Sequence, residues 1–152
     1  MRRCVVALGA ALALVGCATS GPTGSQVLSL GAKAGTARLV IYRTSAAGLF
    51  IQPDYFIDGK KAGMSQPNGF LVCELRPGRY TVTVGNLPSI SIGPGADSVT
   101  LSLRPGTTTY LYAQPRMGIM MPGTIGLTQV PEKQGRSDTA ELHRIEGECG
   151  RT

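Results

Sequence analysis

Two copies of one short pattern decide the fold: CELRPGRYTVTV at residues 73–84 and SLRPGTTTYLYAQ at residues 102–114. Each copy carries Leu-Arg-Pro-Gly, and a tyrosine then leads a run of alternating polar and apolar residues. Proline fixes φ near −65° at the second position of a turn, and glycine supplies a positive φ at the third. Each copy therefore predicts a type II turn that reverses the chain into a strand. The tyrosine ring should be buried, with its hydroxyl on a backbone partner.

Short strand patterns make up the rest of the domain. In the first of them, Leu39 and Ile41 share one face, and Val40 and Tyr42 share the other. An Asp-Gly pair at 58–59 between two short runs is typical of a hairpin. The runs expected to form strands are 37–43, 54–57, 60–63, 69–75, 79–84, 98–103, 108–114 and 124–130. Short strands with frequent turn residues predict an all-β fold, a small antiparallel β-sandwich of about seven to eight strands.

The first sixteen residues are typical of an export signal. Two arginines precede an apolar run that is shorter than the roughly 20 residues needed to span a bilayer. The ending Leu-Val-Gly-Cys resembles a bacterial lipobox, in which the peptide is cut before the cysteine and acyl chains such as palmitate are attached to it. Cys17 is the predicted lipidation site, and an ordinary signal peptide is the alternative. Ala18 after the cysteine implies delivery to the outer membrane, with the periplasmic or surface side left open.

The mature chain divides into three parts. Residues 17–36 lack aromatic residues and are rich in Gly, Ser, Thr and Ala, which predicts a flexible tether with a reach of about 25 Å. Residues 37–131 hold the β-sandwich domain. Residues 132–152 form a charged C-terminal tail.

One short helix is predicted in that tail. Asp138 and Glu141 have the spacing of a capping box, Leu142 and Ile145 share a helical face, and Gly147 would end the helix. Because a helix of two turns is unstable alone in water, we expect it to dock on the sandwich.

The charge pattern argues against nucleic-acid binding. The chain has 15 Lys and Arg against 9 Asp and Glu, and removal of the signal takes away Arg2 and Arg3. The remaining basic residues are scattered, apart from the pair at 60–61, and tryptophan is absent. Clustered cations that track phosphates are therefore lacking.

Two cysteines remain once Cys17 is acylated. An oxidising compartment permits a disulfide between Cys73 and Cys149. In the chain-entropy model, closing a loop of about 75 residues stabilises the fold by roughly 4 kcal/mol. The alternative is two free thiols, with Cys73 packed in a strand as a small apolar residue. The sequence leaves both states open.

The candidates for catalysis or metal binding are few. His143 is the single histidine, in the charged tail, and no pattern gives it a partner for acid–base chemistry, so we expect a solvated side chain. Asp54, Asp58, Glu74 and Asp97 lie near strand ends, where Asp58 belongs to its turn and Glu74 should face solvent. Four zinc ligands are not available in any recognisable spacing. We expect no enzyme activity, no metal and no cofactor.

The segment 116–126 is a candidate partner surface. Its apolar residues Met117, Ile119, Met120 and Met121 lie between glycines. Methionine side chains adapt to different partners, which suits a surface that repacks on contact. Thioethers also bind Cu(I), but a gap-filling or exposed apolar segment is the simpler interpretation.

The order of these motifs resembles the DUF2846 family of small bacterial lipoproteins. The resemblance rests on the lipobox followed by ARLVIYR, YFIDGKKAG, GFLVCELRPGRYTVTV and LSLRPGTTTYLYAQ, and it covers about residues 37–130. It implies a small β-sandwich of the transthyretin or carboxypeptidase-regulatory-like type. It implies no established activity and no catalytic residues.

These observations predict a non-enzymatic lipoprotein that binds or scaffolds another component of the cell envelope. The alternative is a small-ligand carrier or minor hydrolase that uses a pocket between the sheets. A closed pocket with convergent polar groups would favour the alternative, and a packed interior would count against it. A purely structural surface protein cannot be separated from the first interpretation by sequence.

Overall fold

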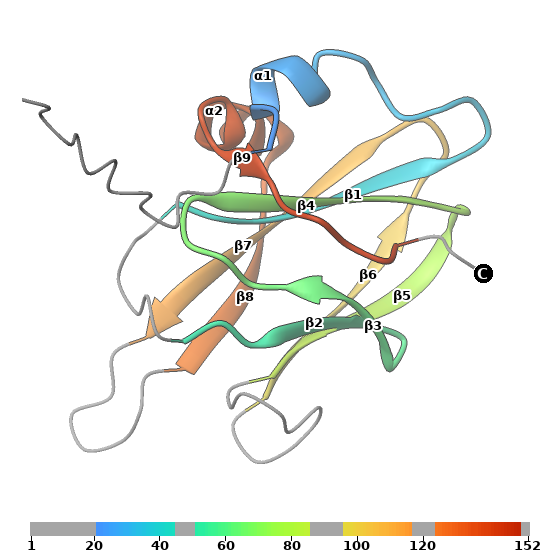
Figure 1. Cartoon of the computed structure of the whole chain (residues 1–152). Coiled ribbons are helices and arrows are strands. Elements are labelled where there is room, and N and C mark those ends of the chain that lie inside the picture. The colour runs from blue at the N-terminus through green and yellow to red at the C-terminus, as the bar shows by residue number, and fades with distance from the viewer. Residues whose placement is uncertain (1–20, 45–50, 86–95, 117–123, 150–152) are drawn as a thin grey trace, which may run out of the picture.

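The computed structural model describes residues 21–44, 51–85, 96–116 and 124–149, shown in colour in Figure 1. Their elements, in chain order, are α1 (Gly24–Val27), β1 (Ala37–Arg43), β2 (Asp54–Ile57), β3 (Lys60–Met64), β4 (Gly69–Leu75), β5 (Gly78–Val84), β6 (Asp97–Leu103), β7 (Thr108–Arg116), β8 (Thr124–Val130), α2 (Glu132–Thr139) and β9 (His143–Arg144). Neither of these two helices is long and apolar enough to cross a membrane.

The strands form two sheets, which confirms the predicted all-β sandwich. Sheet A has the order β8-β7-β1-β4-β9, and sheet B has the order β3-β2-β5-β6. Two pairings in sheet A are parallel, β1 with β7 and β4 with β9, so the expectation of a wholly antiparallel fold is wrong there. The two-residue strand β9 was not predicted, since so short a segment carries no periodicity.

Strand β1 is buried on both faces. Leu39 and Ile41 lie in the core between the sheets, and Val40 and Tyr42 lie in a second core with residues of the helical layer, as predicted for the two faces. Figure 1 shows α1 and α2 on the side of sheet A that is turned away from sheet B. The central place of β1 in sheet A thus explains why all seven of its residues are buried.

The two Leu-Arg-Pro-Gly copies form different structures. In the second copy, the Thr107 N–H donates to the Arg104 carbonyl at 3.3 Å and Gly106 has φ of 70°, as a type II turn requires. In the first copy, Gly78 begins β5 without a positive φ, so the type II turn predicted there is wrong. Both copies join the two sheets, since the first leads from β4 of sheet A to β5 of sheet B and the second leads from β6 of sheet B to β7 of sheet A. The first copy differs because Gly78 pairs with Leu103 of β6, which holds this glycine extended as the first residue of β5.

The tyrosines that follow the two copies also differ. The Tyr80 hydroxyl donates to the Arg76 carbonyl at 2.9 Å, while its ring is only half-buried. The Tyr110 ring is buried beneath α2, but its hydroxyl has no hydrogen-bond partner among the described residues. Tyr80 therefore has the predicted hydrogen bond to a backbone carbonyl, and Tyr110 has the predicted buried ring.

Helix α2 lies earlier in the tail than the predicted helix. Asp138, expected at the N-terminus of the helix, is in its last turn and accepts a hydrogen bond from the Tyr42 hydroxyl at 2.7 Å. Leu142 and Ile145 share no helical face, because Leu142 is buried in the helix-side core and Ile145 between the sheets. Pairing with β4 holds this segment extended, and it outweighs the weak helical preference of a two-turn segment.

Residues 21–30 pack on the domain, whereas the sequence predicted a flexible tether. The Gly24 N–H donates to the Leu142 carbonyl at 3.0 Å, and the Arg144 N–H donates to the Pro22 carbonyl at 2.9 Å. Leu28 is 4% exposed in the helix-side core. A Cβ on Gly24 would lie 2.0 Å from the Thr139 carbonyl oxygen. The segment can pack this closely on α2 because glycine has no Cβ. Composition alone does not separate such edge pairing from a free tether.

The C-terminal strap, residues 142–149, joins the two sheets. Its Ile145 N–H donates to the Phe70 carbonyl of sheet A at 2.9 Å, and its Glu148 N–H donates to the Ala62 carbonyl of sheet B at 2.8 Å. Cys149 at its end is bonded to Cys73 of β4, which is the disulfide that the sequence allowed. The strap thus covers the edge of the sandwich between β3 and β4.

The two turn glycines give a matched test. Gly106→Ala should lower the free energy of unfolding by about 1 kcal/mol, because alanine would have to adopt a positive φ. Gly78→Ala should change it little, since an added Cβ meets only the Tyr80 ring at an ordinary 3.6 Å. Urea denaturation of both variants measures the difference. Equal losses would contradict the assignment of the two turns.

Candidate functional site

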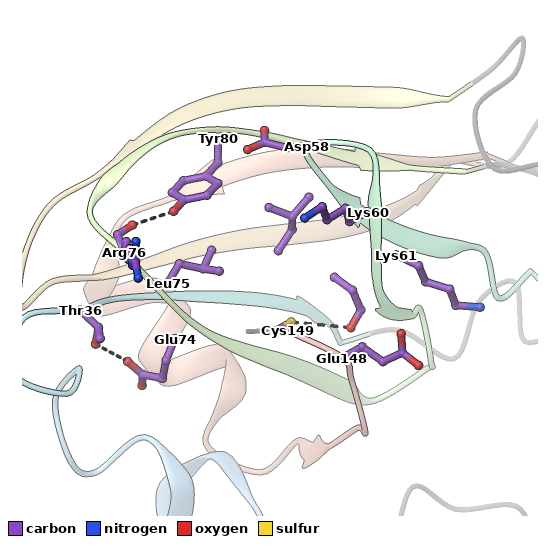
Figure 2. Close-up of a pocket in the computed structure, with 12 residues that line it drawn as sticks. Thr36, Asp58, Lys60, Lys61, Glu74, Leu75, Arg76, Tyr80, Glu148 and Cys149 are labelled. Atoms are coloured by element: carbon purple, nitrogen blue, oxygen red, sulfur yellow. Dashed lines mark hydrogen bonds between the residues drawn. The ribbon is translucent and has the colours of Figure 1, made fainter. Parts of the chain in front are cut away.

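A cleft of about 940 Å³ opens at one end of the sandwich (Figure 2). Strand β4 and the residue after it form one wall, and the β2–β3 hairpin and β5 form another. Residue 36 and the end of the C-terminal strap complete the rim. The lining residues are Thr36, Ile57, Asp58, Lys60, Lys61, Ala62, Glu74, Leu75, Arg76, Tyr80, Glu148 and Cys149.

The cleft has apolar walls beside an aromatic ring. Ile57, Ala62 and Leu75 supply the aliphatic surface, and Tyr80 supplies the ring. The hydrogen bond from Tyr80 to the Arg76 carbonyl fixes the ring beside the cleft. Cys149 places the disulfide at the same site, so the covalent link to Cys73 holds the rim in place.

Glu74 in the cleft is fully engaged by its neighbours. Its carboxylate forms an ion pair with Arg38 and accepts hydrogen bonds from the Thr36 hydroxyl at 2.8 Å and the Lys33 N–H at 3.3 Å. Burial raises the pKa of Glu74, but the hydrogen bonds from Arg38 and Thr36 outweigh it and leave the pKa below its ordinary value. The side chain is 21% exposed, so the expected solvent-facing position is wrong. Glu74 is an ionised structural anchor and is poorly suited to donate a proton.

Two further charges at the cleft are also engaged. The Asp58 carboxylate accepts the Thr81 N–H at 2.8 Å, which ties the β2–β3 turn to β5. Lys61 forms an ion pair with Asp54 at 2.8 Å, and in Figure 2 its side chain points away from the centre of the cleft.

Three charged side chains at the cleft remain available. Lys60, Arg76 and Glu148 make no side-chain hydrogen bond or ion pair with the described part of the chain. Figure 2 shows Lys60 reaching over the cleft from the hairpin, with Arg76 on the β4 side. The cleft therefore offers two free cations and one free carboxylate beside an apolar and aromatic surface.

Comparison with known proteins places the chain in a family. The model of a family described as "Protein of unknown function (DUF2846)" matches residues 33–125, which is more than half of the chain. The chain belongs to the DUF2846 family. A protein of Haemophilus influenzae described as uncharacterized is 28% identical over 142 residues, which cover 90% of this chain and 80% of the relative. The resemblance to the DUF2846 family seen in the sequence is confirmed.

Several residues that the sequence singled out in this DUF2846 protein lie away from the cleft. His143 was expected in a solvated tail, but it lies in β9 and its Nδ1 donates to the Gly21 carbonyl at 2.7 Å. The Asp97 carboxylate accepts the Leu127 N–H at 2.8 Å and joins β6 to β8. Cys17 and the segment 117–121 lie outside the described residues. Their predicted roles stay predictions.

No group of three or more His, Cys, Asp or Glu side chains that could share a metal ion occurs in the ranges that the structure describes. The expectation that this DUF2846 protein uses no metal, no cofactor and no catalytic residue stays a prediction. The strand-end carboxylates that were candidates for acid–base chemistry hold turns and strands in place, as described for Asp58, Glu74 and Asp97.

Sequence reasoning missed the cleft. Lys60 was noticed as part of the basic pair at 60–61, and Arg76 as part of the repeated turn. Nothing in the spacing places these two residues at one cleft, because they line it only after β5 crosses to sheet B and β2 pairs with it.

Proposed function

We propose that this protein is an envelope lipoprotein, anchored by an acylated Cys17, whose β-sandwich binds a protein partner at the cleft. The observation that carries the binding role is the presence of Lys60 and Arg76 beside an apolar wall, with neither side chain in an ion pair or hydrogen bond with the described residues. A partner segment that presents a carboxylate next to an apolar side chain would complement both features. Tyrosine and arginine, both present here, are the residue types enriched at the energetic centres of protein interfaces.

The envelope address is supported by two independent features. The stretch before Cys17 resembles a lipobox, a signal that directs a chain to export and acylation. The bond between Cys73 and Cys149 suits an oxidising compartment, where disulfides persist. A non-enzymatic role fits the engaged carboxylates at the cleft, which bind neighbouring groups of the domain.

The packed interior counts against the alternative of a ligand carrier or hydrolase with a pocket between the sheets. Among the described residues, seventeen buried ones form one continuous core between the sheets. The cleft lies at the end of the sandwich and is open to solvent, which suits a protein segment better than an enclosed small molecule.

The anchor has a direct chemical test. Mass spectrometry of the wild-type protein from cell membranes should find Cys17 as the first residue, carrying acyl chains. Cys17→Ala should incorporate no labelled palmitate, because the acceptor thiol is gone. A wild-type chain with an unmodified Cys17, or one cut at another position, would contradict the anchor.

The cleft can be tested by photo-crosslinking in cells. A photo-reactive residue at Lys60 should capture one dominant envelope protein, while the same residue at the exposed Lys133 of α2 should not. Adding Arg76→Glu to the Lys60 probe should lower the adduct yield about tenfold or more, since it replaces an attraction by a repulsion. The melting temperature of the Arg76→Glu variant should stay unchanged, because Arg76 is exposed. An adduct at Met120 and none at Lys60 would move the contact to the segment 116–126 and contradict the cleft.

A further inference from the structure

The docked N-terminal segment determines which face of the domain lies nearest the lipid anchor; this inference rests on the proposed acylation of Cys17. Gly21 and Pro22 are fixed beside β9 by bonds to His143 and Arg144. Only four peptide units separate Cys17 from Gly21, so the two residues lie at most about 14 Å apart. A flexible tether that included residues 21–36 would have imposed no such limit.

This limit is short compared with the domain. A compact chain of about 130 residues has a diameter on the order of 35 Å. Strand β8 lies at the opposite edge of sheet A, four strand positions from β9, or about 19 Å within the sheet. The face around Gly21 can therefore lie on the headgroups, and β8 lies farther from the attachment point than this face does.

A second depression, of about 650 Å³, opens on that face. Gly21 and Pro22 form part of its rim, and the C-terminal strap and β3 form the rest. Its charged lining consists of two cations, Lys61 and Arg144, and two carboxylates, Glu146 and Glu148. Met64 on its rim is 38% exposed and is one of two exposed large apolar side chains among the described residues.

We propose that this face docks on the membrane and that the depression receives a zwitterionic aminophospholipid headgroup. Arg144, which makes no side-chain hydrogen bond or ion pair with the described part of the chain, faces the phosphate, and Lys61, which is ion-paired with Asp54, lies on the same rim. Glu146 and Glu148 accept hydrogen bonds from the primary ammonium. Met64 lies toward the acyl boundary. An unpaired cation, Arg144, beside the two carboxylates matches a phosphate paired with an ammonium, and this set matches a purely anionic headgroup less well.

The test uses the full, acylated protein in vesicles. A photo-reactive benzoylphenylalanine at Met64 should label phosphatidylethanolamine about tenfold more than the same residue at Thr128, an exposed position on β8. Replacing phosphatidylethanolamine by phosphatidylcholine should lower the Met64 yield several-fold, because a quaternary ammonium donates no hydrogen bond to the carboxylates.

A charge variant isolates the headgroup contact. In the Met64 probe, Arg144→Gln should reduce the lipid adduct several-fold, while Lys133→Gln, an exposed change on α2, should not. Equal lipid labelling at Met64 and Thr128 would overturn the proposal. Equal labelling in the two lipids, or an unchanged yield with Arg144→Gln, would overturn the headgroup assignment.

The failure of this inference can be told apart from failure of the anchor. The intact mass of each purified probe protein reports whether Cys17 is acylated. Missing acyl chains would count against the proposed anchor. Acylated protein with equal labelling at Met64 and Thr128 would overturn the docked orientation alone.

Discussion

The C-terminal strap is the constraint on which the rest of the structure depends. At one edge of the sandwich, Asp97 already links β6 to β8 through the Leu127 amide. At the other edge, the strap pairs with Phe70 of sheet A and with Ala62 of sheet B, and the disulfide at its end is bonded to β4. Because Ile145 of the strap is buried in the inter-sheet core, removing the strap would expose that core to water.

The strap also determines where the two surface depressions lie. On one side it forms the rim of the larger cleft, and on the other side it borders the depression next to Gly21 and Pro22. Lys61 and Glu148 line both. The proposed partner cleft and the proposed membrane face are therefore neighbours, and a partner bound at the cleft would be close to the bilayer surface. The disulfide between Cys149 and Cys73 fixes the end of the strap and therefore the part of each rim that the strap forms.

Local patterns predicted the strands well, because each depends on neighbours in the sequence. The Asp58–Gly59 hairpin and the two faces of β1 follow from a positive-φ turn and from the alternation of side chains. The errors fall where distant segments pair. The first turn copy, the helix expected around Asp138 and the free tether each gave way to hydrogen bonds with residues far away in the sequence. The cleft shares this cause, since only sheet pairing places Lys60 and Arg76 along the same cleft.

Amide hydrogen exchange tests the central role of the strap most directly. In the oxidised protein, the amides of Gly24, Arg144 and Glu148 should exchange slowly, because each donates to a backbone carbonyl. Reduction of the disulfide should speed their exchange together, while the Leu127 amide at the opposite edge keeps its protection. Fast exchange of Gly24 and Arg144 in the oxidised protein, or no change on reduction, would contradict the account.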